Sequence, residues 1–186
     1  MTAVFAVGSS DPQLPVSLRG HMCGRVSLLS KIGCASDRGL CLPIMIVSLL
    51  GQKGGIGKST TAVCLAMAAL QRGAAVLVVD ADPQGTIRTW NDVANERGAS
   101  VPTVVAMGPS MHRPGQLDVL ARRYDLTLID CPPRQGDIQR SALMIADCAL
   151  LPCGPSAADV WALSSTLEMV TEARTLREQL QAAIVI

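Results

Sequence analysis

Residues 45–60 read MIVSLLGQKGGIGKST, and their pattern indicates the fold class of the chain. Its first six residues are nearly all apolar, as in a strand that is covered on both faces of a sheet. A loop rich in glycine follows, and the residues from Lys58 onward have the pattern of a helix. A glycine loop between a buried strand and a helix is the setting in which a protein backbone holds a phosphate group.

The rest of the chain repeats this alternation of strand and helix. We predict strands over residues 45–50, 74–80, 101–107, 126–130, 148–153 and 182–186, and helices over residues 58–72, 86–97, 115–124, 137–147 and 156–180. Strands that alternate with helices are typical of parallel sheets. The sequence therefore predicts an α/β fold with a doubly wound, mostly parallel sheet and helices on both faces.

The pattern predicts one domain boundary, at residue 45. Residues 1–44 are rich in Gly, Ser and Pro, and their apolar residues follow neither a helical nor a strand period. Met45 stands at the start of the first predicted strand. We expect residues 1–44 to be a disordered extension or a stretch before a mis-assigned start, with a targeting or partner-binding tail as the alternative. The folded domain is expected over 45–186, and its C-terminal part is expected to be missing because the chain stops within a strand.

Composition excludes several classes of protein. The net charge of +1 gives no global basic field for nucleic acid. Seven cysteines without a CxxC pair argue against a disulfide framework or a zinc site and favour reduced thiols. The sequence has no run of 18 apolar residues, so no membrane span is predicted. Its N-terminus lacks the basic start and long apolar stretch of a signal peptide. We therefore expect a cytoplasmic protein with no membrane partner.

The glycine loop supplies the expected phosphate contacts. Backbone N–H groups of the loop and of the following helix can surround an anion, and Lys58 can reach the outer phosphates of a nucleotide. The hydroxyl of Ser59 is placed to bind Mg²⁺. The expected nucleotide-binding residues are Gly54, Gly55, Ile56, Gly57, Lys58, Ser59 and Thr60.

Three carboxylates follow apolar strands. Asp80 and Asp82 end the stretch VLVVDAD, and Asp130 ends LTLID. Because the carboxyl ends of parallel strands share one edge of a sheet, these side chains can meet at the phosphate loop. With Ser59 they form the expected magnesium site, in which part of the binding runs through water. A purely structural role remains open for Asp80, which could cap the turn before Pro83.

The motifs KGGIGKS, DADPQ and DCPP, in this order, resemble those of the ParA/MinD family of deviant Walker A P-loop ATPases. The resemblance covers the chain from about Met45 to its end. The stretch DADPQGTIRTWND looks closest to the small ParA-type, ParF-like partition proteins. The domain over 45–186 is thus similar to a P-loop ATPase domain.

The resemblance implies the function and the role of each residue. The cofactors would be ATP and Mg²⁺, and ATP would drive formation of a homodimer. Lys58 would serve its own nucleotide, whereas Lys53 would reach the ATP of the partner subunit, and both would act with Asp82 in catalysis. Asp82 would place Mg²⁺ and the attacking water, Asp80 would support the metal shell, and Asp130 would hold a metal-bound water.

The biological output implied by the resemblance is the partitioning or positioning of plasmid or chromosomal DNA, with weak ATP turnover. A centromere-binding adaptor is the expected partner, and non-specific DNA is a further one, although the sequence shows no basic patch for it. The protein could then associate with the nucleoid. Two alternatives stay open: a nucleotide-binding fragment without hydrolysis, and a MinD-like ATPase that cycles on membranes. The second needs a C-terminal amphipathic helix, where residues 182–186 look like a strand.

Overall fold

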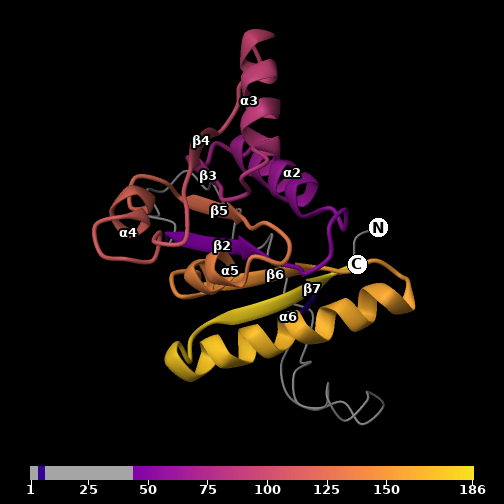
Figure 1. Cartoon of the computed structure of the whole chain (residues 1–186). Helices are drawn as coiled ribbons and strands as arrows, with labels where there is room; N and C mark the ends of the chain where they lie inside the picture. The colour runs from indigo at the N-terminus through magenta and orange to yellow at the C-terminus, as the bar shows by residue number, and fades with distance from the viewer. Residues whose placement is uncertain (1–3, 7–43) are drawn as a thin grey trace.

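The computed structural model describes residues 4–6 and 44–186, which form one sheet with helices packed on it (Figure 1). The elements along the chain are β1 (Val4–Ala6), β2 (Met45–Leu49), α2 (Lys58–Leu70), β3 (Val76–Asp80), α3 (Thr86–Glu96), β4 (Thr103–Ala106), α4 (Leu117–Ala121), β5 (Leu126–Asp130), α5 (Gly136–Leu143), β6 (Cys148–Pro152), α6 (Ala157–Leu176) and β7 (Gln181–Val185). The predicted alternation of strands and helices from residue 45 onward is confirmed.

The described strands form a sheet in the order β1-β7-β6-β2-β5-β3-β4. Strands β2 to β7 run parallel, and β1 joins the edge antiparallel to β7, with Val4 opposite Val185. The mostly parallel sheet is therefore confirmed. Strand β1 was not predicted, and the remainder of the expectation for residues 1–44 lies outside the described residues.

Helices cover both faces of this sheet. On one face, Ala62, Ala66 and Ala69 of α2 pack with Ile87 of α3 against Val47 and its neighbours. The small alanine side chains allow α2 to lie close to the strands. On the other face, α4, α5 and α6 bury an aliphatic cluster, with α6 along the side opposite to α3 in Figure 1. The doubly wound arrangement is thus confirmed, with a core of aliphatic rather than aromatic residues.

Several element ends differ from the prediction. The helix expected over 115–124 is only the short α4, because a run of turns occupies residues 109–116 and Gly115 has φ +82°. Helix α5 ends at Leu143 rather than at residue 147, and Asp147 instead accepts a hydrogen bond from the backbone N–H of Ile46 at 2.8 Å. Within residues 4–6 and 44–186, no helix has both the length and the apolar character to cross a membrane.

The topology places three chain segments at one edge of the sheet. Strand β2 lies between β5 and β6, so the connections on its two sides turn in opposite directions. Ligands of such sheets bind beyond the carboxyl ends of the strands at this point. In register, Leu49 lies opposite Asp130, and Asp130 lies opposite Asp80. The loop after β2 and the turns after β3 and β5 therefore leave the sheet side by side.

Candidate functional site

The loop between β2 and α2 is built around glycine. Gly57 precedes the first residue of α2 with φ +88°, and Gly55 has φ +76°, so both positions favour glycine. No side chain caps the N-terminus of α2. The first N–H groups of this helix and the exposed backbone of the loop can therefore be met by an anion.

Lys58 is the first residue of α2 and lies folded back over the loop. Its side chain is buried, and Nζ donates hydrogen bonds to the carbonyl oxygens of Gly51 at 3.2 Å and Lys53 at 3.1 Å. Burial lowers the pKa of Lys58, while the negative charges of Asp130 and Asp82 act in the opposite direction. The structure thus places this ammonium group against the backbone of the loop, and its contact with phosphate stays a prediction.

Ser59 and Asp130 join the loop to the end of β5. The hydroxyl of Ser59 donates to Oδ2 of Asp130 at 2.6 Å. The other carboxylate oxygen, Oδ1, is buried and has no hydrogen-bond partner in the described part of the chain. Burial raises the pKa of Asp130 to about 6, helped by Asp80 and Asp82, although Ser59 and Lys58 oppose the shift. An ionised Asp130 with an unsatisfied oxygen is a natural cation ligand.

We expect Asp130→Asn to stabilise the Mg²⁺-free protein at neutral pH. Below about pH 4 this carboxyl is protonated in both the folded and the unfolded chain, but above pH 6 folding buries its charge. The free energy of unfolding of the wild type should therefore fall as pH rises from about 4 to about 6, by up to about 3 kcal/mol. The asparagine variant should not lose this stability. Urea denaturation in EDTA at about pH 4 and about pH 7 measures the difference.

The exposed Asp137, seven residues further along, provides the control for that experiment. Asp137→Asn should leave the pH dependence of the wild type intact. Equal pH dependence in the wild type and in Asp130→Asn would contradict the buried ionisation.

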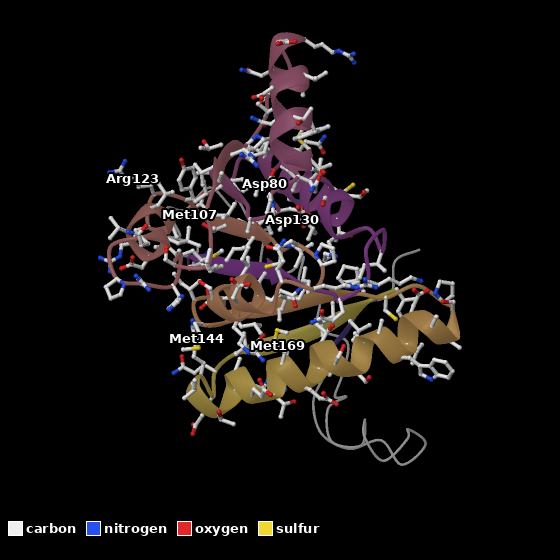
Figure 2. The ribbon with its side chains drawn as sticks, in the orientation of Figure 1. Asp80, Met107, Arg123, Asp130, Met144 and Met169 are labelled. Atoms are coloured by element: carbon white, nitrogen blue, oxygen red, sulfur yellow. The ribbon has the colours of Figure 1, made fainter. Side chains whose placement is uncertain are left out.

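Asp80, the last residue of β3, stabilises the turn that follows the strand. Its carboxylate is fully buried and accepts the backbone N–H of Asp82 at 3.2 Å and that of Arg88 at 3.0 Å. The Nε atom of Arg88 adds an ion pair at 3.4 Å. Asp80 therefore ties the strand end to its turn and to the first turn of α3. Figure 2 labels Asp80 and Asp130, which end adjacent strands.

Asp82 is half-buried and less restrained. Its Oδ1 accepts the backbone N–H of Gln84 at 2.9 Å, which shapes the turn before α3. Arg88 also reaches the carbonyl oxygen of Asp82 at 3.5 Å. The sequence analysis missed Arg88, although a basic residue in the first turn of the helix after DADPQ was a visible signal.

The carboxylates do not form a closed metal cage. Among residues 4–6 and 44–186, no three His, Cys, Asp or Glu side chains gather closely enough to hold a metal ion. Mg²⁺ is commonly held by one or two protein groups together with waters and substrate phosphates. Binding of Mg²⁺ by Ser59, Asp80, Asp82 and Asp130 stays a prediction, in which Asp130 has the most suitable oxygen.

Lys53 lies outside the loop interior and meets a partner that the sequence did not predict. Its Nζ contacts Oδ1 of Asp159 at 2.6 Å, and the two side chains are 46% and 11% exposed. Asp159 also closes a capping box with Ser156 at the start of α6. Hydrogen bonds from Lys53 and Ser156 lower the pKa of Asp159. The two lysines thus occupy different places: Lys58 inside the loop and Lys53 on the surface.

The remaining predicted nucleotide-binding residues lie in the phosphate loop and at the start of α2. Gly54, Gly55 and Thr60 are exposed, and Ile56 is half-buried against Gly51, where any side chain would collide with it. The structure therefore brings Lys58 and Ser59 close to Asp130. It places Asp80 at the end of the adjacent strand and Asp82 in the turn that follows.

Comparisons with known proteins bear on the family of this chain. Residues 47–185 match the family model described as the CobQ/CobB/MinD/ParA nucleotide binding domain. The maintenance of carboxysome distribution protein A of Halothiobacillus neapolitanus is 37% identical over 136 residues, which cover 72% of this chain and 62% of that protein. The chromosome partitioning protein ParA of Myxococcus xanthus is 29% identical over 153 residues, covering 62% and 54%. The chain thus spans little more than half the length of these curated relatives.

A solved structure shows the same fold. The cobyrinic acid a,c-diamide synthase of Mycobacterium smegmatis with bound ADP and magnesium matches with a TM-score of 0.61 and 21% identity, covering 73% of this chain and 70% of that one. At this identity the similarity establishes the architecture only.

Proposed function

The chain belongs to the CobQ/CobB/MinD/ParA nucleotide-binding domain family, and we propose that it is a Mg²⁺-dependent ATPase that dimerises when it binds ATP. The observation that carries the proposal is the separation of the two lysines in one loop. Lys58 is buried and points its ammonium group at loop carbonyls, whereas Lys53 is exposed and held by a surface ion pair. This separation supports a role for Lys58 at the phosphates of its own chain and a role for Lys53 at a group outside that chain.

The ammonium group of Lys58 is the expected phosphate ligand of the loop. It donates two hydrogen bonds, to the carbonyls of Gly51 and Lys53, and an ammonium group has three donors, so one remains for phosphate. Phosphate oxygens carry negative charge, so they attract the ammonium group more strongly than neutral carbonyl oxygens do. Lys58 then holds the phosphates together with the N–H groups at the start of α2.

The residues at the end of β5 fit Mg²⁺. The buried Oδ1 of Asp130 lacks a partner among the described residues, and the Ser59 hydroxyl is already turned toward the same carboxylate. When bound there, Mg²⁺ would neutralise charge that develops on the phosphate oxygens. Asp130 and Ser59 would orient it, and Asp82 would position the attacking water from the adjacent turn.

In this proposal the dimer forms only with ATP because Lys53 contacts the ATP bound to the partner subunit. A half-exposed ion pair with Asp159 is a weak restraint, because solvent screens surface charges. Lys53 can therefore leave Asp159 when a second subunit presents a more negative partner. A cation supplied across an interface to a phosphate stabilises the transition state as an arginine finger does. Formation of the dimer and hydrolysis are then coupled through this one side chain.

The proposed output is the positioning or partitioning of plasmid or chromosomal DNA. The support is the similarity to a chromosome partitioning protein and to a protein named for maintenance of carboxysome distribution. The proposed partners are a second copy of this chain, a centromere-binding adaptor and non-specific DNA, and the proposed location is the cytoplasm or the nucleoid.

Release of phosphate from ATP by the purified chain tests the proposed activity. We expect slow turnover that needs Mg²⁺ and stops when EDTA removes it. ATP binding without any phosphate release would contradict the ATPase proposal and would support the nucleotide-binding fragment instead. Turnover that continues in EDTA would contradict the assigned role of Asp130 and Ser59.

A further inference from the structure

Gln139 is a fully buried polar residue that the proposed reaction has not yet used. It lies in α5 with 0% exposure. Its Nε2 donates to the carbonyl oxygen of Pro132 at 2.7 Å, and its Oε1 accepts from Nε2 of Gln52 at 3.1 Å. A buried amide is costly unless both of its ends are bonded, so this bridge has only one favourable arrangement.

The direction of each hydrogen bond is also determined. The carbonyl of Pro132 can only accept, so it requires the amino end of the Gln139 amide. The Oε1 atom of Gln139 therefore faces Gln52, and Nε2 of Gln52 donates a hydrogen bond to it. A chain of three groups thus connects residue 52 to residue 132 with defined polarity.

The bridge joins two segments that the proposed reaction requires. Gln52 begins the phosphate loop after β2, and Pro132 lies in the turn after β5, two residues from Asp130. The backbone of these strands makes a last hydrogen bond from Cys131 N to Leu49 O at 3.2 Å. Two side-chain contacts add to that backbone bond. At the C-terminal end of the phosphate loop, Ser59 bonds Asp130. At its N-terminal end, Gln52 bonds Gln139, which in turn bonds Pro132.

The turn that follows Pro132 contains a residue in the left-handed backbone region. Arg134 has φ +58°, and it is the single non-glycine residue with positive φ in the part of the chain that the structure describes. A left-handed arginine persists only when its surroundings determine the backbone. The bond from Gln139 to the carbonyl of Pro132 lies two residues earlier and supplies such a restraint.

We propose that Gln139 is a positioning residue for ATP hydrolysis, which couples the phosphate loop to the turn after Asp130 through Gln52 and Pro132. The inference rests on the proposed ATPase function. Lys58 bonds the carbonyls of Gly51 and Lys53 on either side of Gln52, so a phosphate bound by the same ammonium group would compete with these bonds and shift the loop. The bridge carries that rearrangement to the turn and sets the place of Asp130 for the chemical step, without touching the nucleotide.

The test compares Gln139→Met, Gln52→Ala and the double variant. Methionine keeps the length and volume of glutamine but makes neither hydrogen bond. We expect kcat to fall about 10-fold or more in Gln139→Met, because small misplacements of reacting groups cost this much. The Kd for ATP should stay within about 3-fold, since Gln139 makes no expected nucleotide contact. The double variant should be no slower than Gln139→Met, because the bridge is already broken.

Ser141→Ala is the matched control. Ser141 is buried in the same helix and its hydroxyl bonds His112 rather than either loop. This variant should lose thermal stability but keep kcat. If Gln139→Met keeps the kcat of the wild type, or if kcat and ATP affinity fall together, the positioning role is overturned.

A second readout does not depend on hydrolysis. In the absence of nucleotide, Gln52→Ala should speed hydrogen exchange of backbone amides in residues 131–136, about 80 positions away in the sequence. Unchanged exchange there would overturn the coupling. A wild-type chain that binds no ATP would instead contradict the proposed function, so the two failures can be told apart.

Discussion

Lys58→Ala should abolish ATP binding, with a Kd raised more than about 100-fold. The ammonium group is expected to make at least two charge-assisted hydrogen bonds to phosphate oxygens, and their loss corresponds to about 3 kcal/mol or more. Alanine also removes the group that the structure shows bonded to the carbonyls of Gly51 and Lys53. Isothermal titration with Mg²⁺ and ATP measures the change.

Arg72→Ala is the control for that variant. Arg72 is an exposed cation just beyond the C-terminal end of α2, so its removal changes the net charge equally without touching the loop. It should leave the Kd unchanged. Since Lys58 is buried, a thermal denaturation curve must also show that Lys58→Ala is folded. Unchanged ATP affinity in a folded Lys58→Ala variant would refute the assignment of this loop.

Lys53→Ala should bind ATP normally and fail to dimerise. The side chain points away from the loop interior toward Asp159, so the phosphate site of the same chain does not need it. Without the cation that crosses the interface, ATP turnover should fall by about 10³-fold, the lower range for an arginine finger. Light scattering with ATP and a phosphate-release assay measure the two effects. Arg97→Ala, which removes another exposed cation, should change neither.

Asp159→Asn should act in the opposite direction. It weakens the ion pair that holds Lys53 to its own chain, while asparagine can still accept hydrogen bonds at the start of α6. Dimers should then form at lower ATP concentration than in the wild type. This gain must vanish in the Lys53→Ala background, because Asp159 acts only through Lys53. A Lys53→Ala variant that still dimerises with ATP would show that the cross-subunit role is wrong.

Local sequence was sufficient for the phosphate loop and its sheet. The apolar run of β2, the glycines after it and Lys58 at the start of α2 lie within 16 consecutive residues, so their relation did not depend on the rest of the fold. Asp130 could also be predicted, because a carboxylate that ends a buried parallel strand must lie at the ligand edge.

The partners of these residues could not be predicted in the same way. Asp159 is 106 positions from Lys53, and Gln139 is 87 positions from Gln52. Such pairs depend on how α5 and α6 pack against the sheet, which no period in the sequence specifies. Strand β1 is a similar case, since Val4–Ala6 gains its structure from pairing with β7 at the other end of the chain.

The switch between monomer and dimer can be measured as the mass of the wild-type chain in solution, by light scattering with saturating Mg²⁺ and ATP and then with ADP. We predict a dimer with ATP and a monomer with ADP, because only ATP offers Lys53 a third phosphate across the interface. A chain that binds ATP with saturation and keeps the same mass in both nucleotides would contradict it.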